Sequence, residues 1–131
     1  MLIIPGKIVR GHGVASQTLA LQMPFFGKAH PELKACRCAT INVSLECQLE
    51  VISPSFKIGP LDWSGDGIGE LFGFVKIHFE VDESETDAWI YIPYRSPHRS
   101  NPYQVEILAP PLVLKETETC RVHLTASKVT A

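Results

Sequence analysis

Proline and glycine interrupt this chain at short intervals and leave little room for long regular elements. The 131 residues include ten prolines and nine glycines, which are scattered between short apolar runs. Both residue types tend to end regular structure, proline because it lacks a backbone N–H and glycine because ordering it costs more conformational entropy. This distribution favours an all-β domain of short strands that are joined by turns.

Alternating apolar and polar residues mark the individual strands. From Thr119 to Thr125 the even positions are apolar and the odd positions are polar, and Lys76, His78 and Glu80 alternate with apolar neighbours in the same way. A period of two is typical of a strand with one buried face. The predicted strands cover residues 2–10, 17–23, 38–46, 48–52, 71–81, 88–94, 103–109 and 119–126.

The connecting segments complete the predicted fold. Residues 24–33 indicate a short helix or an irregular loop, residues 64–69 a flexible loop, and residues 82–87 a polar connection between two strands. Short strands with little helix favour a small closed or nearly closed barrel, because closure removes exposed sheet edges. We expect residues 1–131 to form a single domain, and a domain of this size buries roughly 68% of its unfolded surface.

Charge and hydropathy restrict the class of protein. The formal net charge of −2 offers no basic surface for nucleic acid. No apolar run approaches the roughly 18 residues that span a bilayer, and the apolar start of the chain is too short for a secretory signal. We therefore expect a cytoplasmic monomer with neither nucleic acid nor membrane among its partners.

The four cysteines, Cys36, Cys38, Cys47 and Cys120, do not follow a recognised pattern. No export signal accompanies them, so we expect reduced thiols. The C-x-C pair with a third cysteine nine residues later does not match the usual spacing of zinc ligands. We expect all four to act as small, buried or half-buried apolar residues.

Thr40 and Asn42 place two oxygen-bearing side chains inside an otherwise apolar strand. Positions two apart on a strand share a face, with Cα atoms roughly 6.6 Å apart. A hydroxyl and a carboxamide are hard oxygen ligands of the kind that Mg²⁺ takes, and a nucleotide would supply further oxygens and the negative charge. The pattern predicts either a magnesium site of this kind or two polar residues on the solvent face of a strand.

Gly11-His12-Gly13 forms a second motif after the first apolar strand. Glycine lets backbone N–H groups approach a phosphate closely, and successive N–H groups form a concavity that binds anions. The loop lacks the third glycine of a dinucleotide-binding turn and the G-K-[ST] ending of a P-loop. On its own it predicts a hairpin turn, with a phosphate-binding loop as the alternative.

Glu106 is the third candidate for a functional residue. It stands between Val105 and Ile107 in an apolar strand that follows the polar loop from Arg95. Partial burial disfavours the charged form of a carboxylate and makes it a better proton acceptor. The pattern therefore predicts a group that holds a hydroxyl or accepts its proton, or else a glutamate on an edge strand that points into water.

In this order, the three motifs resemble those of the archaeal CTP-dependent riboflavin kinases. The shared pattern is a G-x-G loop, a T-[IL]-N-V strand, and an arginine-to-histidine loop that leads into an E-I-x-A-P strand, and it extends from Gly6 to about Leu124. The most specific parts are Thr40–Leu45 and Glu106–Pro110. The resemblance implies a compact six-stranded β-barrel of the cradle-loop type, which transfers the γ-phosphate of CTP to the 5′-hydroxyl of riboflavin and gives FMN.

The resemblance also implies roles for particular residues. Thr40 and Asn42 would bind Mg²⁺, and Glu106 would meet the flavin as the catalytic residue that orients the attacking hydroxyl or takes its proton. Ser96 stands where the family carries a threonine that contacts the flavin. Two segments would enclose the nucleotide, namely Val9, Arg10, Gly11, His12, Gly13 and Val14, together with Pro111, Leu112, Val113 and Leu114.

The chain departs from the family pattern at several positions. Cys38–Ala39 replaces Pro-Gly before the T-x-N motif, Val14–Ala15 follows the glycine loop where the family has a further glycine, and Val113–Leu114 replaces Leu-Arg. About two extra residues also separate Ser96 from Glu106. The donor-nucleotide contacts are thus where the chain differs most, and two functions remain open: a magnesium-dependent riboflavin kinase, and a flavin- or nucleotide-binding module that has lost phosphoryl transfer.

Overall fold

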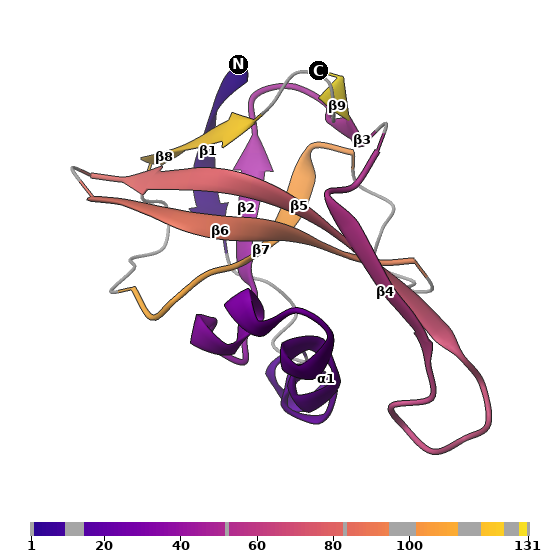
Figure 1. Ribbon diagram of the computed structural model, residues 1–131. Coiled ribbons are helices and arrows are strands. Elements are labelled where there is room, and N and C mark those ends of the chain that lie inside the picture. The colour runs from indigo at the N-terminus through magenta and orange to yellow at the C-terminus, as the bar shows by residue number, and fades with distance from the viewer. Residues whose placement is uncertain are drawn as a thin grey trace.

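The computed structural model describes residues 2–9, 15–51, 53–82, 84–94, 102–112, 119–124 and 129–130. Strands dominate these ranges, and one α-helix and one 3₁₀ helix lie between the first two strands (Figure 1). In chain order the elements are β1 (Leu2–Val9), α1 (Ala15–Ala29), η1 (Pro31–Ala35), β2 (Ile41–Leu45), β3 (Glu50–Val51), β4 (Phe56–Leu61), β5 (Glu70–Val81), β6 (Ser84–Pro93), β7 (Gln104–Leu108), β8 (Thr119–Leu124) and β9 (Val129–Thr130).

Six antiparallel strands pair in a closed ring, in the order β5, β6, β7, β2, β1 and β8, because β8 pairs back onto β5. One edge of β5 serves two partners, since Phe74 pairs with Phe56 of β4 while Val81 pairs with Cys120 of β8. The β4–β5 hairpin therefore extends away from the ring, as Figure 1 shows. The prediction of an all-β, barrel-like fold is confirmed.

Alternation along the strands produces the inner core of the ring. One face of each ring strand points inward, and the buried side chains on these faces are at most 7% exposed. This inner cluster consists of Ile4, Ile8, Val43, Leu45, Val75, Ile77, Phe79, Val81, Ala88, Ile90, Ile92, Ile107, Ala109, Cys120, Val122 and Leu124.

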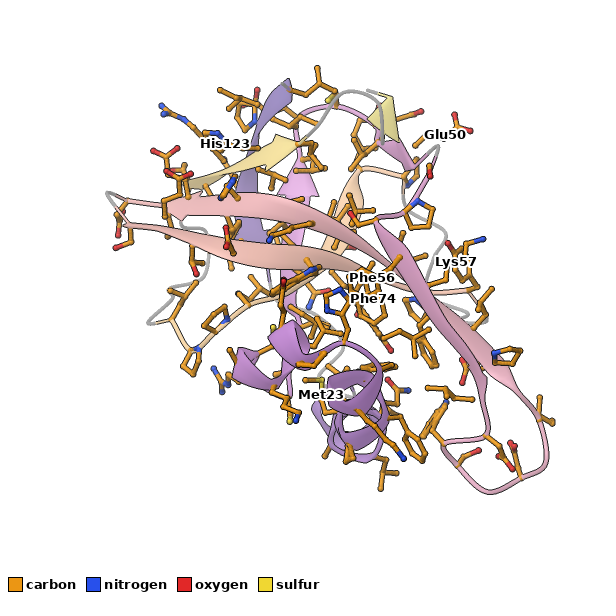
Figure 2. All side chains as sticks on the ribbon, in the orientation of Figure 1. Met23, Glu50, Phe56, Lys57, Phe74 and His123 are labelled. Atoms are coloured by element: carbon orange, nitrogen blue, oxygen red, sulfur yellow. The ribbon has the colours of Figure 1, made fainter. Side chains whose placement is uncertain are left out.

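Helix α1 and η1 cover part of the outer face of the same strands. Phe26 of α1 is fully buried, and its ring centroid lies 5.0 Å from that of Phe72 and 5.2 Å from that of Phe74. Phe74 also stacks on Phe56, its partner in the pairing of β4 with β5 (Figure 2). The buried residues of this outer cluster are Leu19, Met23, Phe26, Leu33, Cys36, Ile58, Phe72, Phe74, Trp89, Tyr91 and Leu108. No helix in the described part of the chain is long and apolar enough to cross a membrane.

The predicted strand at residues 17–23 is wrong, because these residues belong to α1. Leu19, Gln22, Met23 and Phe26 are buried at a spacing of three and four residues, which is the period of a helix that packs on one face. The helix continues through Pro24, where an apolar run was expected to end. Packing against the sheet thus offsets the cost of an internal proline, which is about 3 kcal/mol.

Other element boundaries also differ from the predicted ones. The polar connection expected at 82–87 is shorter, since β6 already begins at Ser84 and Asp82 adopts a positive φ of 54°. Aspartate is one of the few non-glycine residues that tolerate this conformation. The strand β4 was not predicted, and among the described residues of the expected strand at 48–52 only Glu50–Val51 is extended. The loop predicted at 64–69 is confirmed.

Candidate functional site

Strands β2 and β7 bring together two parts of the sequence that are far apart. Asn42 pairs directly with Glu106 in the antiparallel register, and the Thr40 hydroxyl donates a hydrogen bond to Glu106 Oε1 at 3.3 Å. Paired residues on neighbouring strands point to the same face of a sheet. Two of the sequence motifs therefore meet in one cluster of oxygen-bearing side chains.

This cluster lies on the outer face of the ring, where α1 also packs. Val43 and Ile107, which follow Asn42 and Glu106 in sequence, are fully buried in the inner cluster. Successive strand residues point to opposite faces, so Asn42 and Glu106 point outward. Both side chains and that of Thr40 are half-buried. A half-buried cluster remains accessible to a ligand while it is partly shielded from water.

Tyr91 extends the cluster across a third strand. It pairs with Glu106 on the side opposite Asn42, so that Asn42, Glu106 and Tyr91 form one row across β2, β7 and β6. The Tyr91 hydroxyl donates a hydrogen bond to Gln22 Oε1 at 2.7 Å. Gln22 is 3% exposed and is the one buried polar residue in the described part of the chain. The row is thus connected to α1.

The pKa of Tyr91 is raised well above its usual value, and burial is the main cause. The negative charges of Glu106 and Glu70 raise it further. Tyr91 therefore stays protonated at any physiological pH.

Sequence reasoning missed Gln22 and Tyr91. Tyr91 stands in a strand that is buried on both faces, so its position carries no alternation signal. Gln22 is recognisable only once residues 15–29 are assigned to a helix, because helical spacing places it between Leu19 and Phe26 on the buried face. The predicted strand at 17–23 concealed this signal.

The other predicted ligand contacts are only partly within the described residues. Val9 ends β1, is half-buried and pairs with Asn42. Pro111 is exposed, and Leu112 is half-buried and packs against the inner cluster. The remaining predicted contacts lie outside the described residues, namely Arg10, Gly11, His12, Gly13, Val14, Ser96, Val113 and Leu114.

The donor set of the cluster fits Mg²⁺. Thr40, Asn42 and Glu106 offer a hydroxyl, a carboxamide and a carboxylate, and all are hard oxygen donors of the kind that Mg²⁺ prefers alongside water and phosphate. A threonine oxygen has two lone pairs, so Thr40 can accept a metal while it donates its proton to Glu106. Among the described residues no three His, Cys, Asp or Glu side chains gather in a way that holds a metal by themselves.

A cavity of about 580 Å³ lies along β1 and includes Val9 in its lining. Its charged lining residues have both signs, namely Lys7, Arg121, Glu46, Glu80 and Asp82. Pockets for small ligands typically enclose about 300–1,000 Å³. Val9 pairs with Asn42, so the cavity extends to the residue beside the Thr40–Asn42–Glu106 cluster.

The chain matches no protein-family model, and no curated protein matches it either. The roles of Thr40 and Asn42 as metal ligands and of Glu106 as the catalytic residue stay predictions, argued from the motifs and from the geometry above.

Proposed function

We propose that the protein is a magnesium-dependent phosphotransferase that moves the γ-phosphate of CTP to the 5′-hydroxyl of riboflavin and gives FMN. The observation that supports this most is the meeting of Thr40, Asn42 and Glu106 in one half-buried cluster. The choice of CTP and riboflavin as substrates comes from the resemblance of the T-I-N-V and E-I-L-A-P motifs to the archaeal kinases.

The cluster contains the parts that phosphoryl transfer needs. This reaction depends mainly on positioning and on stabilising the charge of the transferred group. When bound, Mg²⁺ neutralises negative charge on the phosphate oxygens. Thr40 and Asn42 hold the ion with neutral oxygens, which leaves the nucleotide to supply the negative charge. Glu106 orients the riboflavin hydroxyl and accepts its proton as the oxygen attacks the γ-phosphorus and CDP leaves.

The hydrogen bond from Thr40 links these two tasks. It holds the Glu106 carboxylate beside the metal ligand, at 3.3 Å from the hydroxyl oxygen. Hydrogen bonds of this kind orient metal ligands and raise their basicity. The same contact keeps the proton acceptor close to where the phosphate would bind.

Product formation with purified protein tests the proposal. The protein is incubated with riboflavin, Mg²⁺ and CTP, ATP, GTP or UTP in turn, and FMN is separated by chromatography. We expect FMN with CTP. No FMN with any of the four nucleotides would overturn the proposal, and quenching of flavin fluorescence without product would instead support the binding module.

A matched pair of variants tests the role of Glu106. Glu106→Gln keeps the shape of the side chain but removes the proton acceptor, so we expect turnover to fall by about 10²–10⁴-fold with a much smaller change in KM. Glu50→Gln is the control, because Glu50 is exposed on β3 and lies apart from α1 in Figure 2. Equal turnover of the two variants would contradict the role of Glu106.

A further inference from the structure

Lys7 lies on the same outer face of the ring as Asn42, a ligand of the proposed magnesium site. Ile8 belongs to the inner cluster, so its neighbours Lys7 and Val9 point outward. Val9 pairs with Asn42, and Lys7 pairs with Ser44, two residues further along β2. From the usual spacing along and between strands, the Cα atoms of Lys7 and Asn42 are roughly 8 Å apart. A lysine side chain is long enough to cover most of that distance.

Two hydroxyl groups flank Lys7 in the same row of the sheet. Ser44 on β2 and Thr119 on β8 are its direct partners on either side, so all three side chains point to one face. All three also line the cavity of about 580 Å³ along β1. An ammonium group donates hydrogen bonds and accepts none, and a hydroxyl group also donates. The row therefore presents hydrogen-bond donors and one positive charge to the cavity, which is the chemistry that binds an anion.

The charge of Lys7 is not neutralised within the described part of the chain. The other cation that lines the cavity, Arg121, pairs with Glu80 at 3.6 Å. No ion pair joins Lys7 to a carboxylate of the described residues. Lys7 is thus the cation of the cavity that remains available to a ligand.

The carboxylates of the cavity lie on the sides that face away from the proposed magnesium site. The backbone N–H of Glu46 donates to the Pro5 carbonyl oxygen at 3.0 Å, which places Glu46 one row beyond Lys7. Glu80 belongs to β5 and Asp82 follows it, and β8 separates both from β1. A ligand that extends from the magnesium site into the cavity therefore meets the Lys7 row first.

We propose that Lys7, together with the Ser44 and Thr119 hydroxyls, binds the non-reacting phosphates of the donor nucleotide. This inference rests on the proposed function. Thr40 and Asn42 are neutral, so apart from the ion they would hold, they do not offset the charge of a triphosphate. A phosphate chain whose γ-phosphate lies at these two residues extends to the next row of the sheet, where Lys7 supplies the positive charge. Lysine binds phosphate in this way as a compact point charge.

Substitution of Lys7 tests the inference by kinetics. Lys7→Met keeps an unbranched side chain but removes the charge. We expect the KM for CTP to rise about tenfold, the low end of the loss for a hydrogen bond to a charged group. The KM for riboflavin and kcat should change less than about twofold, because non-reacting phosphates are held equally before and during transfer. Lys7→Arg keeps the charge and should stay within about threefold of the wild type. An unchanged KM for CTP in Lys7→Met would overturn the inference.

Lys57 provides the matched control. It is exposed on β4, which pairs with β5 alone and is not part of the ring, and it is labelled beside Phe56 in Figure 2. Lys57→Met makes the same change in net charge at a different part of the sheet, so we expect an unchanged KM for CTP. An equal rise in both variants would mean that net charge, and not the position of Lys7, controls nucleotide binding, and it would contradict the inference.

Binding of inorganic tripolyphosphate gives a readout that does not need turnover. This probe carries the charge of the nucleotide phosphates without the base or the sugar. Isothermal titration calorimetry with Mg²⁺ present should show binding about tenfold weaker in Lys7→Met than in the wild type or Lys57→Met. The affinity of the wild type should also fall as salt is added.

The two experiments separate the inference from the proposed function. If the wild type does not bind tripolyphosphate, or if both lysine variants bind it equally, the inference is overturned even if the protein makes FMN. If binding depends on Lys7 but the wild type makes no FMN, the proposed phosphotransferase activity fails while the phosphate site at Lys7 is established.

Discussion

Thr40 is the residue at which the metal-binding and the proton-accepting parts of the proposed site meet. Its hydroxyl donates to Glu106, and the same oxygen is the predicted ligand. Thr40→Val preserves the shape of the side chain but removes its oxygen. We expect turnover to fall by about a hundredfold or more, because loss of a hydrogen bond that supports a metal ligand already costs up to about a hundredfold. Thr40→Ser keeps the oxygen and serves as the control.

The measurement for Thr40 is steady-state turnover over a range of Mg²⁺ concentrations. The valine variant should need more Mg²⁺ for half-maximal turnover, whereas the serine variant should follow the wild type. If valine and serine variants need the same Mg²⁺ concentration, Thr40 is not a ligand. A urea titration of both variants checks that the fold is intact.

Cys36 and Cys38 differ in chemistry although one residue separates them. Cys36 is 7% exposed, and burial, followed by the nearby charge of Cys38, raises the pKa of its thiol from 9.0 to about 11. Only about one Cys36 in a thousand is a thiolate at pH 8, and the thiolate is the reactive form. Cys38 is exposed. We expect iodoacetamide to modify Cys38 well before Cys36 in the folded protein.

Mass spectrometry of peptides after timed alkylation measures this difference. Because the pKa of Cys36 is raised in the folded state, its modification should accelerate as the pH rises toward 11 or when the protein is unfolded in urea. Equal rates for the two cysteines in the folded protein at pH 8 would contradict the burial of Cys36.

At the scale of elements, α1 is held to the sheet mainly through Phe26. This side chain is fully buried against Phe72 and Phe74, whereas its neighbour Phe25 is 43% exposed. Phe26→Ala should lower the free energy of unfolding by about 3–5 kcal/mol, as is typical of a phenylalanine removed from a core. Phe25→Ala should lower it by about 1 kcal/mol or less. Urea unfolding of both variants makes the comparison.

The α1 segment shows where a single sequence misleads. Around Leu19 and Leu21 the apolar residues satisfy a period of two over a few positions, and Pro24 is a strong local signal for a break. The sheet decides that this segment is helical, because it gives one helical face a surface to cover. That face consists of Leu19, Met23 and Phe26. Tertiary packing therefore overrides local preference here, and the short range of the local signal explains the wrong prediction.

The candidate site was easier to predict than the helix beside it. Thr40 and Asn42 were expected on one face because the side-chain period of a strand is two, whichever strand becomes the neighbour. In the structure β2 begins at Ile41, so Thr40 lies directly before the strand and reaches Glu106 through its hydroxyl. That Glu106 would be this neighbour depends on the register between β2 and β7, which only the resemblance to a family suggested. The hydrogen bond between Tyr91 and Gln22 depends on the packing of α1 and could not be predicted from local patterns.

At the scale of the whole molecule, the inner and outer clusters share the same strands. In β5, Phe72 and Phe74 belong to the outer cluster, while Val75 and Ile77 belong to the inner one. Losing the pairing of these strands would expose both clusters at once, so neither is stable alone. Cooperative unfolding follows from this arrangement, and a small domain of this kind is expected to unfold in one transition.

Trp89 fluorescence reports on the unfolding of the outer cluster, because this side chain is 4% exposed within that cluster. Its urea midpoint can therefore be compared with that of the strands. Trp63→Phe leaves Trp89 as the sole tryptophan of the two in the chain. In this variant we expect Trp89 fluorescence and far-ultraviolet circular dichroism, which reports mainly on the strands, to give the same urea midpoint. An earlier fluorescence transition would mean that α1 leaves the sheet while the ring is still closed. In that case Gln22 would also leave Tyr91 before global unfolding, and the candidate site would lose its connection to α1 while the ring of strands persists.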